Sequence, residues 1–369
     1  MSQIWRGMSG GIEVLENVNE MADLPDISTI DSEGVWYIES GEFAPDYIAP
    51  TNWDSTAGEF TDWFSLFDGQ ILVDIPDKVA YGSGDNNVYV HDTSDWSLSE
   101  TLTEAGNNVE TVTFSPDGSQ IAYDASDNVY VHDTSDWSLI ETLDEAGSGV
   151  DSPTFSPDGT QIAYGSSDSP VYVHDTSDWS LIETLDEAGD SVQAVTFSPD
   201  GSQIAYGSDD DNVYIHDTSD WSLNETLTEA GGRVYSVTFS ADGTQIAYGS
   251  DDDNVYVHDT SDWSLSETLT ESGGRRVYSV TFSPDGSQIA YGSDDDNVYV
   301  HDTSNWSLTE TLTESGDRVW SVTFTEDGSK IAYASSDKNV YVHYTSDWSL
   351  NETLTEAGDS VYSVTFSPL

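Results

Sequence analysis

The sequence contains no cysteine, which excludes disulfides, thiolate metal sites and cysteine nucleophiles. Basic residues are scarce, because eight lysines and arginines stand against 70 aspartates and glutamates, giving a formal net charge of −62. Such a charge repels phosphate backbones and anionic headgroups, so we exclude nucleic acid and membrane surfaces as partners. The sequence contains no run of about 18 apolar residues, so it predicts no membrane-spanning helix. Residues 1–20 lack the basic and apolar regions of a secretory signal.

The acidity of the chain has two possible causes, disorder or adaptation to salt. Disordered chains contain few aromatic residues, whereas this sequence has 12 Trp, 20 Tyr and 11 Phe. It can therefore form a core. In about 1 M salt the screening length is roughly 3 Å, so repulsion between surface carboxylates largely disappears. We interpret the composition, with lysine only at Lys78, Lys330 and Lys338, as that of a halophilic protein.

A Thr-Ser-Asp/Asn-Trp-Ser-Leu box recurs along most of the chain. Its tryptophans are Trp96, Trp137, Trp179, Trp221, Trp263, Trp306 and Trp348. The spacing of 41 to 43 residues between successive boxes is typical of four-stranded propeller blades. We expect these side chains to pack beneath a turn between the third and fourth strands, rather than to form a platform for sugars.

One repeat shows the order of the predicted strands. Val234–Phe239, Ile246–Tyr248, Val255–His258 and Leu265–Leu269 are short runs rich in β-branched and aromatic residues. Asp-Gly and Asp-Asn turns separate them, which are hairpin signals. Because the 3.6-residue period of a helix never appears, the sequence predicts an all-β fold.

The repeat motifs Val-x-Ser-Val-x-Phe-Ser-Pro-Asp-Gly, Ile-Ala-Tyr-Gly-Ser-Asp-Asp and Val-Tyr-Val-His-Asp resemble the WD-repeat (WD40-like) family, in a haloarchaeal type. The resemblance covers residues 79–369 and recurs seven times. It implies a seven-bladed β-propeller that binds proteins and has no cofactor. His-Asp replaces the usual Trp-Asp, and Ala-Gly or Ser-Gly replaces Gly-His. The family's Asp-His-Ser-Trp network therefore cannot be transferred to this chain.

The chain enters the repeats with a second strand and ends after a lone first strand. We therefore predict that Val361–Phe366 pairs with Val79–Tyr81 and closes the ring, which leaves no open sheet edge there. Ile71–Val73 is an alternative closing strand. The other first strands are expected to start at valines, the earliest being Val109.

Residues 1–74 contain no repeat and form, in our interpretation, a small β-rich anchoring segment ahead of the propeller at 75–369. Residues 12–18 have apolar positions compatible with one short helix. The layout of residues 24–67, rich in aromatics, is similar to small N-terminal modules of viral tail and fibre proteins. Since about 70 residues form only a marginal core alone, we expect this segment to pack on the propeller or on a partner chain.

The seven histidines all occupy the third strand, and the strand spacing of about 4.8 Å keeps copies in neighbouring blades too far apart for a shared metal. We expect buried neutral imidazoles bonded to Ser or Thr. The acidic turns at 209–211, 251–253 and 294–296 lack the ligand spacing of a dedicated calcium loop. We interpret them as hairpin turns, with weak cation binding as the alternative. Neither a metal nor a cofactor site is predicted.

The connections into the first strands vary, and they contain four of the five arginines. The candidate partner-binding residues are Arg233, Tyr235, Arg275, Arg276, Tyr278, Arg318, Trp320 and Tyr362. Arg, Tyr and Trp dominate binding hot spots, and a positive island in an acidic protein would attract an acidic ligand. The alternative is that the arginines only neutralise the acidic turns. Pro153, in place of the usual first-strand Val, has no functional explanation at this level.

No Ser-His-Asp arrangement, phosphate-binding glycine loop or metal spacing departs from the repeat, so we predict no enzyme. A β-propeller hosts many functions, and the best hypothesis is a non-catalytic recognition module. We expect a structural component of a haloarchaeal virus particle, such as a tail, fibre or capsid appendage with a possible role in host recognition. The alternative is a cytoplasmic scaffold of a halophilic archaeon.

The halophilic interpretation predicts that dilution from about 2 M to about 0.05 M NaCl unfolds the protein, because surface carboxylates are then no longer screened. Circular dichroism and tryptophan fluorescence measure this loss of structure. Sucrose at matched viscosity serves as the control for a nonspecific solvent effect. A cooperative melting transition that is the same at both salt concentrations would contradict the interpretation.

Overall fold

The computed structural model describes residues 78–368 and seven short strands within residues 1–77. Contacts divide the chain into two units, Met1–Ile75 and Pro76–Leu369. All regular elements among the described residues are β-strands. No helix in this part of the chain is long and apolar enough to cross a membrane.

The strands described in the first unit form three small antiparallel sheets. They are β1 (Ile4–Met8) with β2 (Gly11–Leu15), β3 (Tyr47–Ile48) with β6 (Phe64–Phe67) and β7 (Gln70–Ile71), and β4 (Trp53–Asp54) with β5 (Glu59–Phe60). The short helix expected over residues 12–18 is wrong as far as Leu15, because β2 runs through it. The Ile-x-Val alternation in this stretch has the two-residue period of a strand. Residues 16–18 lie outside the described part.

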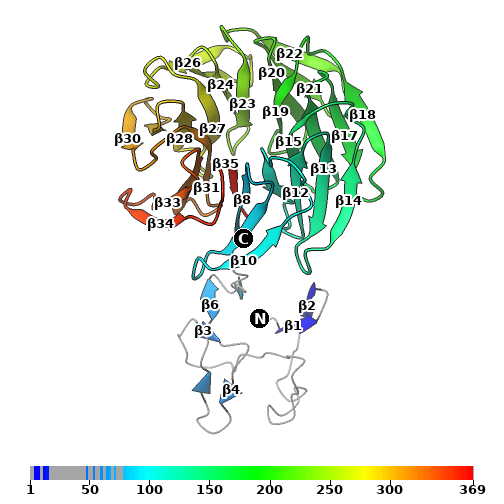
Figure 1. Ribbon diagram of the computed structural model, residues 1–369, viewed down its shortest axis with the longest axis vertical. Helices are drawn as coiled ribbons and strands as arrows, with labels where there is room; N and C mark the ends of the chain where they lie inside the picture. The colour runs from blue at the N-terminus through cyan, green and yellow to red at the C-terminus, as the bar shows by residue number, and fades with distance from the viewer. Residues whose placement is uncertain are drawn as a thin grey trace. The chain divides into compact units, whose positions relative to one another are not determined.

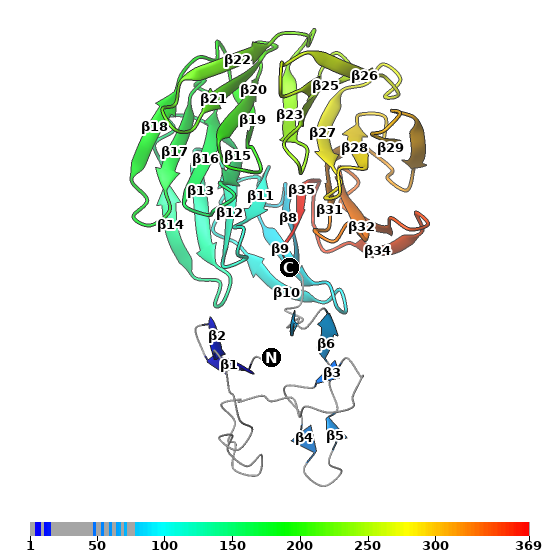
Figure 2. The ribbon, with the colours of Figure 1, turned by 180° about the vertical axis from the view of Figure 1, so that it is seen from behind.

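The second unit is a ring of seven four-stranded sheets, the blades of a β-propeller (Figure 1 and Figure 2). The first blade consists of β35 (Val361–Phe366), β8 (Lys78–Ser83), β9 (Val88–Asp92) and β10 (Leu98–Leu102). The second consists of β11 (Val112–Phe114), β12 (Gln120–Ala125), β13 (Asn128–Asp133) and β14 (Leu139–Leu143). The third consists of β15 (Val150–Phe155), β16 (Gln161–Ser166), β17 (Val171–Asp175) and β18 (Leu181–Leu185).

The remaining four blades follow the same order from the centre of the ring outward. The fourth consists of β19 (Val192–Phe197), β20 (Gln203–Ser208), β21 (Val213–Asp217) and β22 (Leu223–Leu227). The fifth consists of β23 (Val234–Phe239), β24 (Gln245–Ser250), β25 (Val255–Asp259) and β26 (Leu265–Leu269). The sixth consists of β27 (Val277–Phe282), β28 (Gln288–Ser293), β29 (Val298–Asp302) and β30 (Leu308–Leu312). The seventh consists of β31 (Val319–Phe324), β32 (Lys330–Ser335), β33 (Val340–Tyr344) and β34 (Leu350–Leu354).

The ring closes as predicted from the sequence. β35 pairs antiparallel with β8, placing Val364 opposite Tyr81 and Phe366 opposite Val79. Ile71 belongs to β7 and pairs with Leu66 instead. The seven first strands each contact both of their neighbours around the ring, so they form the inner wall of the propeller (Figure 1).

The interfaces between blades hold the apolar core. In five blades the glycine of Ala-Tyr-Gly-Ser faces a valine at or just before the first strand of the next blade, and a Cβ there would lie 2.5–2.7 Å from that valine's Cγ1. Backbone N–H groups of the first strands also donate to serine hydroxyls of the preceding blade at five of the seven junctions, at 3.0–3.3 Å. The blades are therefore locked at one fixed separation.

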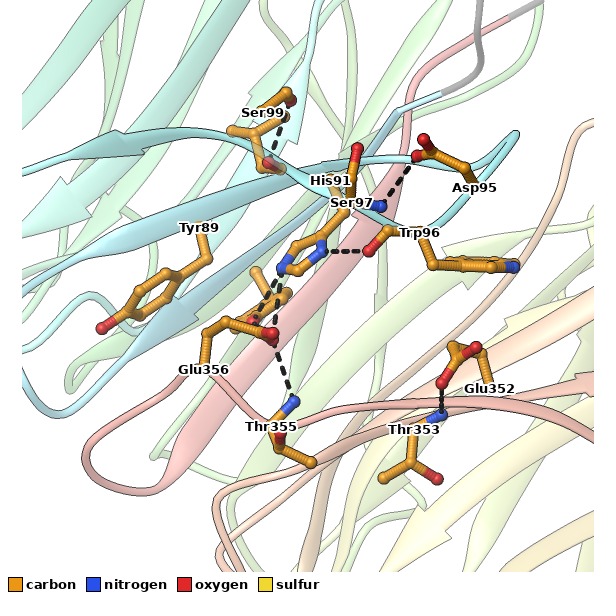
Figure 3. A network of polar contacts seen from close by, with 12 residues as sticks. Tyr89, His91, Asp95, Trp96, Ser97, Ser99, Glu352, Thr353, Thr355 and Glu356 are labelled. Atoms are coloured by element: carbon orange, nitrogen blue, oxygen red, sulfur yellow. Dashed lines mark hydrogen bonds and ion pairs between the residues drawn. The ribbon is translucent and has the colours of Figure 1, made fainter.

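A histidine fixes the outer part of every blade. Its Nδ1 donates to the backbone carbonyl of the box tryptophan at 2.9–3.0 Å. Its Nε2 lies 3.1–3.4 Å from the hydroxyl of a fully buried second-strand tyrosine. In six blades a glutamate from the link before the first strand completes the cluster, as Glu356 does at His91 (Figure 3). The histidines are buried as predicted, but the expected Ser or Thr partners are wrong.

The tryptophan that accepts this bond has an unusual backbone. All seven box tryptophans have φ between 58° and 62°, a left-handed conformation that is costly for bulky residues. Their rings pack against the core clusters between blades. The predicted packing role at the turn between the third and fourth strands is confirmed, and the histidine bond together with ring packing holds the strained turn.

Candidate partner-binding surface

The variable connections and the acidic turns lie on one rim of the propeller. The N–H of Asp251 donates to the carbonyl of Arg233 at 2.8 Å, and the N–H of Asp294 donates to the carbonyl of Arg276 at 3.0 Å. In the seventh blade Ser336 makes the same bond to Arg318. Each arginine-bearing connection is thus tied to the turn between the second and third strands of its own blade.

Every rim arginine has a carboxylate partner in the structure. Arg233 Nε lies 3.6 Å from Asp209 Oδ2, and Arg275 Nη1 lies 3.9 Å from Asp294 Oδ2. Arg276 pairs with Asp251, and Arg318 pairs with Asp294. The arginine side chains remain 47–60% exposed. The arginines therefore pair with the first aspartates of the acidic turns, as the alternative of charge relief predicts, and Asp294 serves two of them. The attraction of an acidic ligand stays a prediction.

The aromatic residues of the candidate set form one continuous arc. The ring centroids of Tyr235 and Tyr278 are 5.2 Å apart, those of Tyr278 and Trp320 are 4.3 Å apart, and those of Trp320 and Tyr362 are 5.6 Å apart. Tyr278 is buried, whereas the other three rings are partly exposed. Trp320 Nε1 donates to Ser336 Oγ at 2.6 Å. We call these four residues the aromatic arc.

The arc occupies the same position in four neighbouring first strands, directly after the first valine. Glu110, Asp151 and Gln193 are the equivalent residues in the second, third and fourth blades. Glu110 lies at the Tyr362 end of the arc, because the N–H of Val112, two residues after it, donates to the hydroxyl of Ser363 at 3.1 Å. Of the seven equivalent residues, the four in neighbouring blades of the arc are aromatic and the other three are polar or acidic.

Asp124 is a further candidate site residue, which the sequence analysis missed. It replaces the glycine of Ala-Tyr-Gly-Ser in the second blade, and it is 1% exposed. Its Oδ1 accepts the N–H groups of Glu110 and Thr111 at 2.8 Å each. Its Oδ2 is buried and has no hydrogen-bond partner. Because the carboxylate takes these two N–H groups, β11 begins at Val112 and not at Val109 as expected.

Pro153 lies at the same junction and explains a second irregularity. Ser152 has φ 56°, and the pairing of β15 with β16 shifts between Asp151 and Thr154. Proline has no N–H. The backbone N–H that donates to a serine hydroxyl of the preceding blade at other junctions is therefore missing between the third and second blades. The substitutions of glycine by Asp124 and valine by Pro153 together were the sequence signal for this site.

Burial and mutual repulsion make the carboxyls of this junction easy to protonate. Burial raises the pKa of Asp124 well above its usual range, and the nearby Asp151 raises it further. Burial, followed by the charges of Glu110 and Asp209, raises the pKa of Asp151 to about 7. Loss of hydration also raises the pKa of Glu110, although solvent reaches its side chain. We call Glu110, Asp124 and Asp151 the carboxyl cluster.

The acidic turns are held by internal hydrogen bonds. In the fourth blade Asp210 Oδ2 accepts from the Tyr214 hydroxyl at 2.8 Å and from the N–H of Gly189 at 2.6 Å. Among the described residues no group of three or more His, Asp or Glu side chains is arranged to hold a metal ion. Weak cation binding at these turns stays a prediction.

Comparison with known proteins gives a partial match. A family model described as WD domain, G-beta repeat, matches residues 179–217, 221–259, 263–302 and 306–343. Four matched repeats in a seven-bladed ring support the WD-repeat β-propeller family. A search of curated proteins finds no match. The rim arginines lie within the matched residues, whereas the carboxyl cluster lies outside them.

The raised pKa of Asp151 predicts how stability depends on pH. The folded state holds this proton up to about pH 7, whereas the unfolded chain releases it near pH 4, so folding stability falls as the pH rises between these values. Asp151→Asn removes this loss and should stabilise the protein at pH 8 by on the order of 4 kcal/mol, because each unit of pKa difference between the folded and unfolded states is worth about 1.4 kcal/mol. Denaturant unfolding measures the difference.

The control is Asp190→Asn, which removes a charge from an exposed position on the connection into β19. Its effect on the free energy of unfolding should stay nearly constant across the same pH range. A difference between Asp151→Asn and wild type that does not grow with pH would show that Asp151 ionises like an ordinary surface carboxylate.

Proposed function

We propose that this chain is a non-catalytic protein-interaction module that binds its partner through the rim surface. This surface consists of Arg233, Tyr235, Arg275, Arg276, Tyr278, Arg318, Trp320 and Tyr362. The observation that carries the proposal is the continuous aromatic arc, flanked by four arginines whose side chains are about half exposed. WD-repeat propellers are typically interaction scaffolds, which agrees with this proposal.

The surface is held in place before a partner arrives. Ion pairs orient the arginines, and ring contacts orient the aromatic residues, with the Arg318 guanidinium 5.9 Å from the centre of the Trp320 ring. An interface built from ordered side chains loses less conformational entropy on binding than one built from free side chains. Exposed ion pairs add little to the stability of a fold. Their effect of orienting the arginine side chains therefore supports a role in binding better than a role in stability.

We further propose that the chain belongs to a virus particle of a halophilic archaeon, with the segment at residues 1–74 as its anchor and the propeller rim directed to a partner or host receptor. The non-repeat, aromatic-rich composition of that segment supports the proposal. Mass spectrometry of particles purified through a salt gradient tests it. Detection at a fixed ratio to a capsid protein is expected, whereas detection only in the cytosol would favour a cytoplasmic scaffold.

Arg275→Ala, Arg276→Ala and Trp320→Ala combined should weaken partner binding by about thirtyfold or more, which corresponds to the loss of one binding hot spot. Quantitative co-purification of the partner from the same high-salt extract measures this loss. Leu139→Ala with Leu181→Ala is the matched control, because these leucines are 44–45% exposed on outer strands away from the rim. Unchanged binding by the triple variant, with an unchanged melting temperature, would place the interface elsewhere.

A further inference from the structure

The carboxyl cluster is an unusual feature of this propeller because it lies in a junction between blades and lacks a counter-ion. The rim arginines pair with Asp209, Asp251 and Asp294. Within residues 78–368 no ion pair reaches Asp124 or Asp151. Of the charges that raise the pKa values of these two residues, all are other carboxylates.

The cluster also contains an unsatisfied acceptor. Asp124 is 1% exposed, and its Oδ2 has no hydrogen-bond partner while its Oδ1 has two. Buried polar atoms without partners are rare in folded proteins, and leaving one unpaired costs about 1–3 kcal/mol. A donor supplied by a bound group would satisfy this oxygen.

The aromatic arc ends beside this cluster. Tyr362, its last ring, precedes Ser363, whose hydroxyl accepts the N–H of Val112, two residues after Glu110, at 3.1 Å. Glu110 and Asp151 are equivalent in the repeat to Tyr362, and they belong to the second and third blades, which follow the blade of Tyr362 around the ring. A cation near the carboxyls would therefore also lie near an aromatic face, and aromatic faces attract cations within about 6 Å.

We propose that the carboxyl cluster binds a lysine or arginine side chain of the protein partner, with Tyr362 and the aromatic arc beside it. The inference rests on the proposed function and names the chemistry of the partner. An ammonium or guanidinium group offers three to five donors, enough for Asp124 Oδ2 and for the carboxyl of Asp151.

An inorganic cation fits the observations less well. Calcium and magnesium need several oxygen ligands at about 2.0–2.6 Å, and the described residues contain no group of three carboxylates arranged for a metal. A side chain brings its own hydrogens and an apolar stem, and the stem can contact the aromatic arc. The observations therefore favour the organic cation over the metal.

Molar salt strengthens this choice. The screening length of about 3 Å removes the attraction between exposed charges, whereas buried charges are screened much less. The general charge of −62 then gives a cationic partner no preferred position on the surface. Desolvated carboxylates keep their attraction, so they can select one basic side chain.

The test measures binding of two short peptides to the full chain in about 2 M KCl at about pH 8, by peptide line broadening in nuclear magnetic resonance. The probes are acetyl-Gly-Lys-Gly-amide and its arginine counterpart, and the neutral controls contain Nε-acetyl-lysine or citrulline. At least one charged probe should bind at least about tenfold more tightly than its neutral control, a difference of about 1.4 kcal/mol.

Asp124→Asn combined with Asp151→Asn should weaken binding of the charged probe at least about tenfold, whereas Asp190→Asn should change it less than about twofold. The double variant removes like-charge repulsion and should melt at or above the wild-type temperature, so a loss of binding does not reflect unfolding. A single Asp151→Asn variant, which leaves the backbone contacts of Asp124 in place, should lose binding as well.

Four results would overturn the inference. Equal binding of charged and neutral peptides would show that charge is not recognised. Absence of binding by both charged peptides would mean that the carboxyls only share a proton. Binding of Mg²⁺ or Ca²⁺ at constant ionic strength, lost in the double variant and competing with the peptides, would make the cluster a metal site. If the double variant keeps the natural partner and the Arg275/Arg276/Trp320 alanine variant loses it, the proposed function stands and this inference fails.

Discussion

The propeller depends on one buried imidazole in each blade. His91 in the first blade joins the third strand, the carbonyl of Trp96 in the next turn, the hydroxyl of Tyr81 in the second strand and the carboxylate of Glu356 in the link before β35. Buried polar groups are costly when unpaired. The imidazole therefore holds the strained tryptophan turn, and with it the outer strand, to the inner part of the blade.

This network replaces the one expected of the family. The sequence departs from Trp-Asp and Gly-His at the usual positions, and the structure supplies stiffness from a Tyr–His–Glu cluster and a backbone carbonyl. In the second blade the glutamate does not complete this cluster, and among the described residues the Tyr123 hydroxyl is bonded only to His132. The same blade contains Asp124 and borders Pro153, so several departures from the repeat gather at one junction. In a repeat protein whose other blades are nearly uniform, residues that depart from the repeat can thus be concentrated at a single junction between blades.

Repetition explains which features could be predicted from the sequence. Strand order, ring closure by Val361–Phe366 and the positions of the histidines follow from periodic patterns and short-range turn chemistry. Side-chain partners do not, because they depend on the direction of each side chain even at short separation. Each histidine contacts a tyrosine only 9 or 10 residues away, where Ser or Thr was expected. The aromatic arc could be located as a set of residues, but its tilted and edge-on ring contacts depend on the closeness of the first strands. The ion pairing of the arginines depends on the direction of each side chain.

The carboxyl cluster reveals a conflict between folding and recognition. Burial of Asp124 and Asp151 raises their pKa values and lowers stability at neutral pH. An apolar residue or a glycine, as in five other blades, would fold more favourably at the position of Asp124. Perturbed carboxyls without a structural benefit are typical of functional sites, and natural proteins accept such local instability where activity requires it. In molar salt, desolvation is also the condition under which a carboxylate retains its attraction for a cation, so the feature that destabilises the junction is the one that allows it to discriminate.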